Sequence, residues 1–422
     1  MTVPRAVTDH INRTCAYLQK TSPKLAKFYR NCYPHTIDSA IRQMEDGSLF
    51  VLTGDIPAMW LRDSSAQVNH YIPLSKDPEV AALLRGVLQK QFAFILTDPY
   101  ANAFNPLPNG QGHTDDRPKN QPWVFERKYE VDSLCYPIRL CYRYWKATGD
   151  QTLIDSQLED VMRTILRVWQ TEQHHMERSP YRFFRTGCPY QDTIHNEGMG
   201  NPVAYTGMTW SGFRPSDDAC TYGYLIASNM FAVVVLGYAA EMLGAEHPMH
   251  DEIMHLRAQI QAGIQEYGIV EHSKYGKVYA CKVDGNGNHL LMDDANIPSL
   301  ISMPYLDYAG TDDPIYRQTR KMLLSKDNPY YYEGTYAKGI GSPHTPKQYI
   351  WHLALSMQGL TSDCDEECLA LLHMLETSDG DTGYMHEGFL ADDPHVFTRP
   401  WFTWSDSLFC EFVDTCIEKH IV

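Results

Sequence analysis

The sequence has no long hydrophobic run. Its longest apolar stretch, from Met230 to Leu243, carries Gly and Glu and is shorter than the roughly 18 residues of a membrane-spanning helix. The opening MTVPRAVTDHINRTC lacks the apolar segment of a signal peptide. We therefore expect a cytoplasmic protein without a membrane partner.

Positive charge is scarce. The chain has 36 Lys and Arg against 52 Asp and Glu, which gives a net charge of −16. Nucleic acids and anionic membranes both bind cationic surfaces, so this balance argues against either as a partner. The composition favours a neutral ligand, and nothing in it indicates an obligate protein partner.

Paired cysteines and cofactor motifs are also lacking. Eleven cysteines are scattered singly apart from Cys364 and Cys368, which is not a disulfide framework and is typical of reduced thiols in a cytosol. The CDEEC pair has no second pair to complete a zinc site. The patterns GxGxxG, GxxxxGK[ST], HExxH and GxSxG do not occur, so we expect no metal and no cofactor.

Aromatic residues and helical periodicity are what the chain does have. It contains 27 Tyr, 15 Phe and 8 Trp. Apolar residues recur every three or four positions over 134–145, 158–169 and 253–264, which predicts amphipathic helices. Further helices are predicted over 7–20, 23–46, 64–75, 79–98, 218–243, 293–306, 312–325, 346–361, 363–377 and 401–418.

About a dozen helices joined in hairpins predict an all-α (α/α)6 barrel. No linker or charge block divides the chain, so we expect one catalytic domain over 1–422. An α-solenoid would need a repeat of fixed period, and none is visible. A β-hairpin is predicted where KVYACKV and NHLLM flank DGNG. Long loops at 99–128, 175–217, 326–345 and 378–400 are the expected places for function.

The segment TGDIPAMWLRDSSAQV places an indole, a guanidinium and a carboxylate within four positions, before a predicted helix. Trp60 can serve as a platform for a sugar ring, while Arg62 and Asp63 can hold neighbouring hydroxyl groups. The alternative is an ion pair at a helix start beside a core Trp.

Two loops carry candidate catalytic carboxylates. In SGFRPSDDACTYGY, Asp217 and Asp218 follow Ser216, although acidic residues at a helix start are also favoured by the helix dipole. In TGYMHEGF, Glu387 lies in a loop with glycines on both sides, which let the backbone turn the carboxylate toward a ligand.

Other segments supply candidate substrate-binding residues. FTRPWFTWSDSLFCEF gives Arg399 and Trp404, with core packing as the alternative for one of its two helical tryptophans. FERKYEVDSLCYPI gives Asp132, which also fits a helix cap. His344 in GSPHTPKQ is a further candidate, although a lone histidine is more often structural.

Carboxylates on separate loops, together with aromatic residues, are typical of acetal hydrolysis. One carboxylic acid protonates the leaving oxygen, and a second carboxylate acts at the other face of the sugar. The separation of the two decides whether the configuration is inverted or retained. An anionic pocket also stabilises a transition state that is cationic at the anomeric carbon.

Four long segments resemble glycoside hydrolase family 125, in order along almost the whole chain. They are GDIPAMWLRDSSAQV, SGFRPSDDAC with the following GYLIASNMFAVVVLG, SPHTPKQYIWHLALSMQGLTS and TRPWFTWSDSLF. The resemblance implies an (α/α)6 barrel and an inverting exo-α-1,6-mannosidase that needs no metal. It also implies Glu387 as the general base, Asp218 or its neighbour Asp217 as the general acid, and Arg62 and Asp63 as ligands of the terminal mannose.

Two other functions are compatible with such a barrel. A sugar epimerase or isomerase would need a pair of histidines at the site, for which His344 and His386 are the loop candidates. A non-catalytic glycan-binding protein would bind the same sugars and would not depend on Glu387 for turnover.

Overall fold

The computed structural model describes residues 1–422 and is built mainly of α-helices. The helices are α1 (Arg5–Leu18), α2 (Pro23–Cys32), α3 (Leu61–Asn69), α4 (Pro78–Thr97), α5 (Val131–Thr148), α6 (Ser156–Glu172), α7 (His175–Arg178), α8 (His195–Gly198), α9 (Ile226–Leu243), α10 (His250–Tyr267), α11 (Pro314–Leu323), α12 (His352–Leu360), α13 (Asp365–Thr377) and α14 (Thr403–Glu418).

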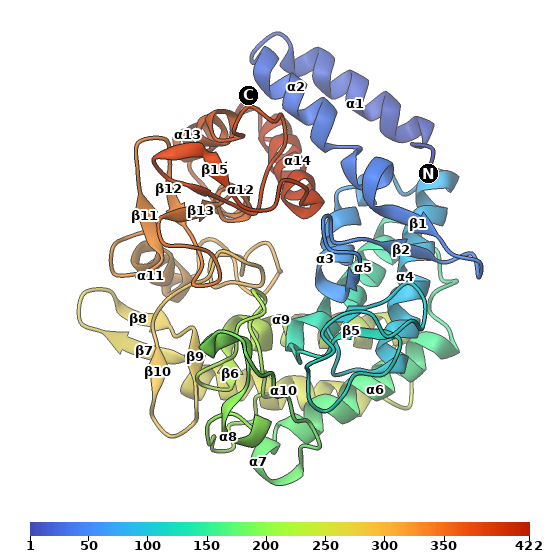
Figure 1. The fold of residues 1–422 in the computed structure, drawn as a ribbon, viewed down its shortest axis with the longest axis vertical. Helices are drawn as coiled ribbons and strands as arrows, with labels where there is room; N and C mark the ends of the chain where they lie inside the picture. The colour runs from blue at the N-terminus through green and yellow to red at the C-terminus, as the bar shows by residue number, and fades with distance from the viewer.

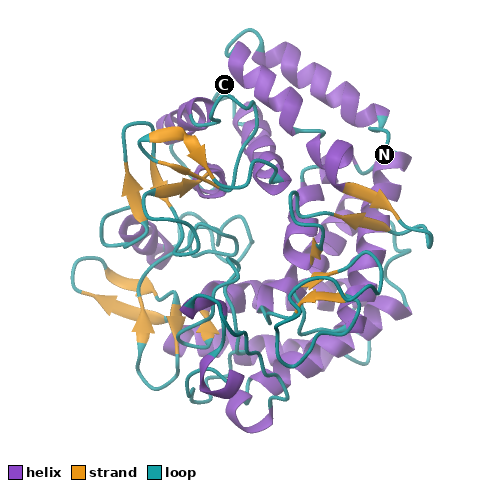
Figure 2. Ribbon diagram, in the orientation of Figure 1, coloured by secondary structure: helices purple, strands orange, loops and turns teal.

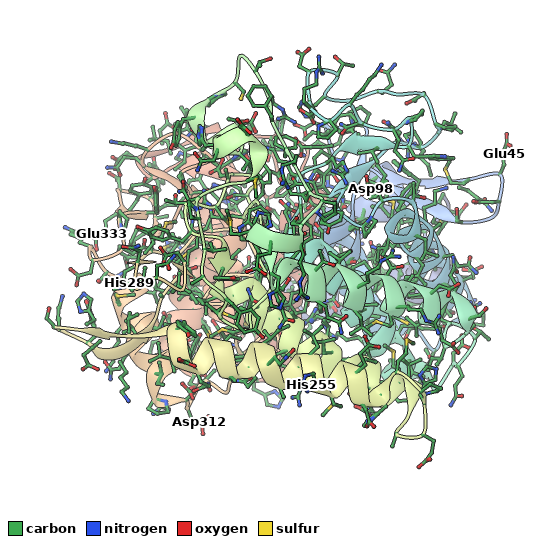
Figure 3. The ribbon with its side chains drawn as sticks, turned by 90° about the horizontal axis from the view of Figure 1, so that it is seen from below. Glu45, Asp98, His255, His289, Asp312 and Glu333 are labelled. Carbon is green, nitrogen blue, oxygen red and sulfur yellow. The ribbon has the colours of Figure 1, made fainter.

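The long helices form a ring of inner and outer members (Figure 1). Neighbouring inner helices pack in the order α12, α14, α3, α5 and α9, and each touches an outer partner, as α9 touches α10 and α12 touches α13. This arrangement confirms the predicted (α/α)6 barrel. Figure 3 shows α10 along the lower edge of the molecule, with His255 on its solvent side.

Two helices, α4 and α9, are long and apolar enough to cross a membrane by length and composition alone. Both are mostly buried within the barrel. The sequence of α9 is apolar on all sides because the helix belongs to the inner ring, where neighbours cover most of its surface.

The predicted helix over 293–306 is wrong. The segment forms consecutive turns that cross the inside of the ring, where the Tyr136 hydroxyl donates to the Ile297 carbonyl at 3.1 Å and the Arg139 guanidinium donates to the Tyr305 carbonyl at 3.0 Å. Its two prolines, at 298 and 304, remove backbone donors that a helix would use.

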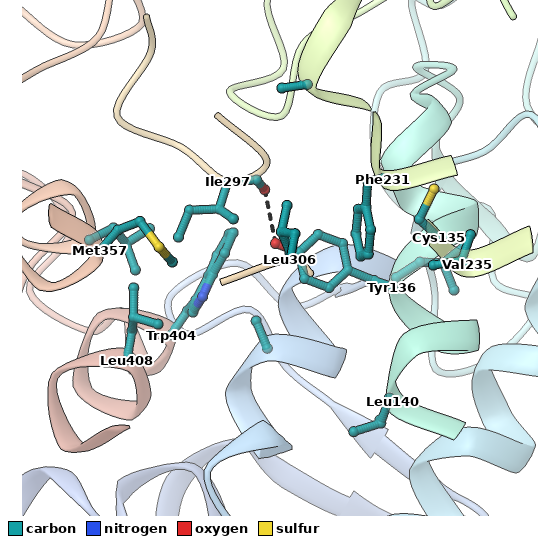
Figure 4. Packing of buried hydrophobic residues seen from close by; sticks show 14 of the residues in the cluster. Cys135, Tyr136, Leu140, Phe231, Val235, Ile297, Leu306, Met357, Trp404 and Leu408 are labelled. Carbon is teal, nitrogen blue, oxygen red and sulfur yellow. Dashed lines mark hydrogen bonds between the residues drawn. The ribbon is translucent and has the colours of Figure 1, made fainter. Parts of the chain in front are cut away.

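Trp404 belongs to the packed interior beside this segment (Figure 4). Its indole is 2% exposed and meets the ring of Tyr136 edge-on at 6.2 Å, and Tyr136 in turn meets Phe231 at 5.1 Å. Edge-to-face contacts of this kind stabilise a core. The prediction that Trp404 binds substrate is therefore corrected, because this residue packs in the hydrophobic core.

The strands are short and are spread around the ring in six small sheets (Figure 2). They are β1 (Ile41–Gln43), β2 (Leu49–Val51), β3 (Met59–Trp60), β4 (Ala103–Phe104), β5 (Val124–Glu126), β6 (Tyr224–Leu225), β7 (Ile269–His272), β8 (Gly276–Tyr279), β9 (Lys282–Val283), β10 (His289–Leu290), β11 (Tyr331–Glu333), β12 (Lys338–Ile340), β13 (Tyr349–Trp351), β14 (Gly388–Leu390) and β15 (Asp393–Phe397).

The predicted hairpin is confirmed only for the residues next to its turn. Strand β9 pairs with β10 across the turn, where Asp284 accepts hydrogen bonds from the backbone of Asn286 and Asn288 at 2.8 and 3.0 Å. The KVY part of the first segment instead lies in β8 and pairs with β7. Three predicted helices are also too long. Residues 33–46 contain turns, a short π-helix (Thr36–Ala40) and strand β1, and 218–225 and 346–351 form bends, turns and strands.

Candidate active site

A cavity of about 350 Å³ collects most of the predicted site residues. Seven of the ten line it, and they come from segments far apart in the sequence. These seven are Trp60, Arg62, Asp63, Asp217, His344, Glu387 and Arg399. The other three, Asp132, Asp218 and Trp404, do not line it.

The turn before α3 brings Trp60 and Arg62 to the cavity. Gly54 has φ +63°, and a Cβ atom there would lie 2.0 Å from the carbonyl oxygen of Trp401, so only glycine fits. Strand β3 then pairs Trp60 with Ala103 and ends where α3 begins. The indole packs on Phe125 with ring centroids 5.8 Å apart, and its Nε1 has no partner in the protein.

Arg62 is the centre of a buried ion network. Its Nη1 donates to Glu130 at 2.5 Å and to Asp132 at 3.2 Å, its Nη2 donates to Asp217 at 3.3 Å, and its Nε lies 3.3 Å from Asp63. The guanidinium therefore serves four carboxylates, and only its Nε lacks a hydrogen-bond partner. The main effect of Arg62 is therefore to hold these carboxylates in place and to balance their charge. It has few N–H donors left for a sugar.

Asp132 acts on the site through Arg62. It is fully buried, and its carboxylate accepts from Arg62 and from the Ser228 hydroxyl, the latter at 3.1 Å. The prediction that Asp132 binds substrate is therefore corrected to a positioning role. Its neighbour Glu130 lies on the same guanidinium, and burial raises the pKa of Glu130 well above its usual range despite the charge of Arg62.

Asp217 and Asp218 face different surroundings, although they are adjacent. A tight turn joins them: the Asp217 amide donates to the Arg214 carbonyl at 2.8 Å, and Asp217 has φ +64°. Asp217 lines the cavity with a side chain 24% exposed, whereas Asp218 is 3% exposed and is held by the Arg214 guanidinium. The sequence-based choice of Asp218 as the acid therefore does not fit its position.

The Asp217 carboxylate is kept ionised by neighbouring positive charges. Burial alone would raise its pKa, but the charges of Arg62 and Lys128 outweigh burial and lower it. The carboxylate also accepts from the Asn102 amide at 3.3 Å, and the Lys128 ammonium donates to the Asp217 carbonyl at 2.7 Å. These contacts hold the residue in place with one side open to the cavity.

Glu387 is fixed by its backbone and has a free carboxylate. It directly precedes β14, where Gly388 pairs with Trp351, and the carbonyl of the preceding residue, His386, accepts from the Ser405 hydroxyl at 2.8 Å. No hydrogen bond from the protein reaches its carboxylate, and the nearest cation is the Arg399 Nη1 at 3.8 Å. A carboxylate with open acceptors can hold and deprotonate a water molecule.

Arg399 is oriented by the turn around Asp55. Its Nε and Nη2 donate to the Asp55 carboxylate at 2.8 and 2.6 Å, and Nη2 also donates to the Thr53 carbonyl at 2.5 Å. The residue itself has φ +50°, an uncommon conformation for a side chain other than glycine. Arg399 therefore links the rim of the Trp60 turn to Glu387.

His344 and Asp63 lie among the carboxylates. Burial lowers the pKa of His344, but its contact with Asp218 at 3.3 Å and the charges of Glu387 and Asp217 raise it to about 9, so this imidazole is cationic at neutral pH. Burial raises the pKa of Asp63 to about 6 against the opposing charges of Arg62 and Arg399.

The sequence interpretation missed other residues at the cavity. Asn296 and Trp351 both line it, and both fall inside segments that were interpreted as helices. Thr398 and Phe402 also line it and flank Arg399. Thr398, Phe402 and Trp351 lie within ten positions of a predicted site residue in the chain, whereas Asn296 does not.

The cavity does not contain the histidine pair of the epimerase alternative. His344 lines it, but His386 is fully buried and stacks on Phe397 with centroids 3.7 Å apart. The residues that do meet there are three carboxylates, two guanidinium groups and one imidazole, with the indoles of Trp60 and Trp351 beside them.

Comparisons with known proteins agree with this set. A family profile described as metal-independent α-mannosidase (GH125) matches residues 22–414. A meiotically up-regulated gene 157 protein of Schizosaccharomyces pombe is 40% identical over 94% of this chain and 82% of its own length. A metal-independent α-mannosidase of Streptococcus pneumoniae, solved in a non-productive complex with α-1,6-mannobiose, is 46% identical, covers 99% of both chains and has a TM-score of 0.96.

More distant structures share the fold alone. A bacterial glucoamylase bound to acarbose has a TM-score of 0.60 at 12% identity and covers 97% of this chain and 58% of its own. A cellobiose 2-epimerase of Spirochaeta thermophila has a TM-score of 0.54 at 8% identity and covers 99% of this chain and all of its own. By its profile match and its relatives, the chain belongs to the metal-independent α-mannosidase family, GH125.

Proposed function

We propose that the protein is an inverting exo-α-1,6-mannosidase that releases a terminal mannose from an α-1,6-linked oligosaccharide. The observation that carries the proposal is the meeting of Glu387 and Asp217, from distant segments, in one cavity of about 350 Å³. This volume is at the small end of the usual range for ligand sites, about 300–1,000 Å³, and suits one sugar residue. The mannobiose bound by the S. pneumoniae relative supports the linkage.

Glu387 is proposed as the general base. Its carboxylate has no protein hydrogen bond, so it can accept a proton from a water molecule that attacks the anomeric carbon. The Arg399 guanidinium lies 3.8 Å away and places a positive charge beside this carboxylate without occupying its acceptor atoms.

Asp217 is proposed as the general acid, in place of Asp218. It is the carboxylate of the pair that reaches the cavity, where it would protonate the glycosidic oxygen as the bond to the leaving sugar breaks. A bound sugar excludes water and adds to the burial that already opposes ionisation of Asp217, which favours the protonated acid.

Binding of the terminal mannose is proposed for Trp60 and Asp63, with Arg62 behind them. Both residues line the cavity, and neither the indole Nε1 of Trp60 nor the Oδ1 of Asp63 forms a hydrogen bond within the protein. Because Arg62 fixes Asp63 and Asp217 together, the sugar would be held in one orientation relative to the acid.

A hydrolysis assay tests the activity. Wild-type protein with α-1,6-mannobiose should release free mannose, and α-1,2- and α-1,3-linked mannobioses should be cleaved much more slowly. Conversion of free mannose to another hexose without hydrolysis of any mannobiose would favour the epimerase alternative and refute the proposal.

A cytoplasmic location is part of the proposal. All eleven cysteines are free, and eight of them are buried thiols, which suits a reducing compartment. Fractionation of cells that express the tagged protein should place it with cytosolic markers; recovery from the secreted fraction would contradict this part.

A further inference from the structure

A second cavity, of about 290 Å³, lies on the other side of the Asp217–Asp218 turn. Asp218, Arg214 and Lys282 line it, together with His195 and Tyr330. The proposed mechanism uses none of this space. The two cavities are separated by adjacent residues, since Asp217 lines the first and Asp218 lines the second.

Lys282 has no partner in this cavity. It is 3% exposed, at the start of β9, and no carboxylate, carbonyl or hydroxyl group of the protein forms an ion pair or hydrogen bond with its ammonium. Other buried lysines of the chain are paired: Lys128 contacts Asp192 and Glu126, and Lys90 contacts Asp46. Burying an ammonium without a counter-charge is unfavourable, and an anion in the cavity would supply that charge.

The carboxylates near this cavity are already paired with other groups. Arg214 is shared between Asp218 and Asp294, and Asp218 also contacts His344 at 3.3 Å. His344 itself lines the first cavity, where Glu387 and Asp217 also act on it. Burial and the charge of Arg214 lower the pKa of Lys282, so an anion beside this side chain would favour its charged form.

We propose that this second cavity binds a compact oxyanion, a phosphate group, through the ammonium of Lys282. Phosphate offers several acceptor oxygens to one ammonium, and its negative charge would pair with the Lys282 side chain, which has no carboxylate partner. The phosphate can be free or carried by a saccharide, since both present the same chemistry. This inference concerns binding and does not depend on the proposed catalytic roles.

Thermal unfolding with and without inorganic phosphate tests the site. At about ten times the dissociation constant, phosphate should raise the Tm of the wild-type protein by roughly 2 °C or more, with saturation. Lys282→Met should abolish this shift, and in phosphate-free buffer its Tm should equal or exceed that of the wild type because an unpaired buried charge is removed. Lys277→Met, on the exposed side of β8, is the matched control and should keep the shift.

Phosphorus NMR of the wild-type protein provides a readout that needs no variant. Inorganic phosphate and mannose 6-phosphate are titrated separately, mannose is added as an unlabelled competitor, and sodium chloride keeps the ionic strength equal. Saturable broadening with inorganic phosphate indicates a free anion, and tighter binding of mannose 6-phosphate than of phosphate indicates a phosphate carried by the saccharide. A wild-type protein that shows no saturable phosphate effect, or a Tm shift equal in Lys282→Met, would overturn the proposal.

Discussion

The two walls of the active-site cavity are built in opposite ways. On one wall, Arg62 holds Glu130, Asp132 and Asp217 through hydrogen bonds of 2.5–3.3 Å, and all but Asp217 are buried. On the other, Glu387 has no protein hydrogen bond, and its nearest cation is 3.8 Å away.

This difference suggests that one wall contributes mainly to the stability of the fold and the other mainly to catalysis. The Arg62 wall fixes charges that would repel one another without the guanidinium, so it should matter for folding as well as for binding. The Glu387 wall leaves acceptor atoms open, so it should matter for turnover and little for folding.

Arg62→Met should lower the free energy of unfolding by about 3–5 kcal/mol, because it leaves three buried carboxylates without their cation. Urea unfolding measures the change. The matched control is Arg163→Met, which removes an exposed guanidinium paired with Asp160 and should change little. If both variants were equally stable, the Arg62 network would not contribute to the stability of the fold.

Glu387→Gln should lower turnover of α-1,6-mannobiose by at least ~10² without lowering the Tm, because it removes the base and breaks no protein hydrogen bond. Steady-state kinetics and thermal unfolding are measured on the same preparation. Glu333→Gln, on the exposed strand β11, serves as the control. Near-normal turnover of Glu387→Gln would refute its role.

Asp217→Asn and Asp218→Asn should differ in their dependence on the leaving group. Loss of the acid is compensated by a leaving group that needs no proton, so Asp217→Asn should be about 10² slower on mannobiose and nearly normal on 2,4-dinitrophenyl α-mannoside. Asp218→Asn should show the same small loss on both substrates. The reverse pattern would return the acid to Asp218.

Asp63 should make stability depend on pH. Its pKa is raised to about 6, so between its unfolded value near 4 and pH 6 the folded state holds a proton that the unfolded state has lost. The free energy of unfolding should therefore fall as pH rises through this window, by on the order of 1–3 kcal/mol from this group. In Asp63→Asn that part of the slope should vanish; an unchanged slope would contradict the assignment.

The helices were predictable because their signal is local. Apolar residues at steps of three or four define α5, α6 and α10 in the sequence and in the structure. The segment 293–306 has a similar apolar content but forms bends and turns. Its prolines interrupt a helix, and the Asp293 carboxylate accepts hydrogen bonds from the backbone amides of residues 300 and 301 at 3.0 Å. That outcome depends on tertiary contacts.

The site was predictable in its residue types and not in its finer geometry. Loops with carboxylates and glycines indicated Glu387 and the pair Asp217 and Asp218. Which member of the pair reaches the cavity depends on the backbone of one tight turn, and no spacing pattern reports that. Arg62 was likewise predicted to bind a sugar. The carboxylates that accept its hydrogen bonds are about 70 and 155 positions away in the sequence, so a local pattern could not reveal them.

The stereochemistry of the first product tests the central claim most directly. Proton NMR of the anomeric signals follows α-1,6-mannobiose from the moment the enzyme is added, before mutarotation. A base and an acid that act from two sides with a water between them should release β-mannose first. Release of α-mannose first, or no hydrolysis by an enzyme shown to be folded, would contradict the account.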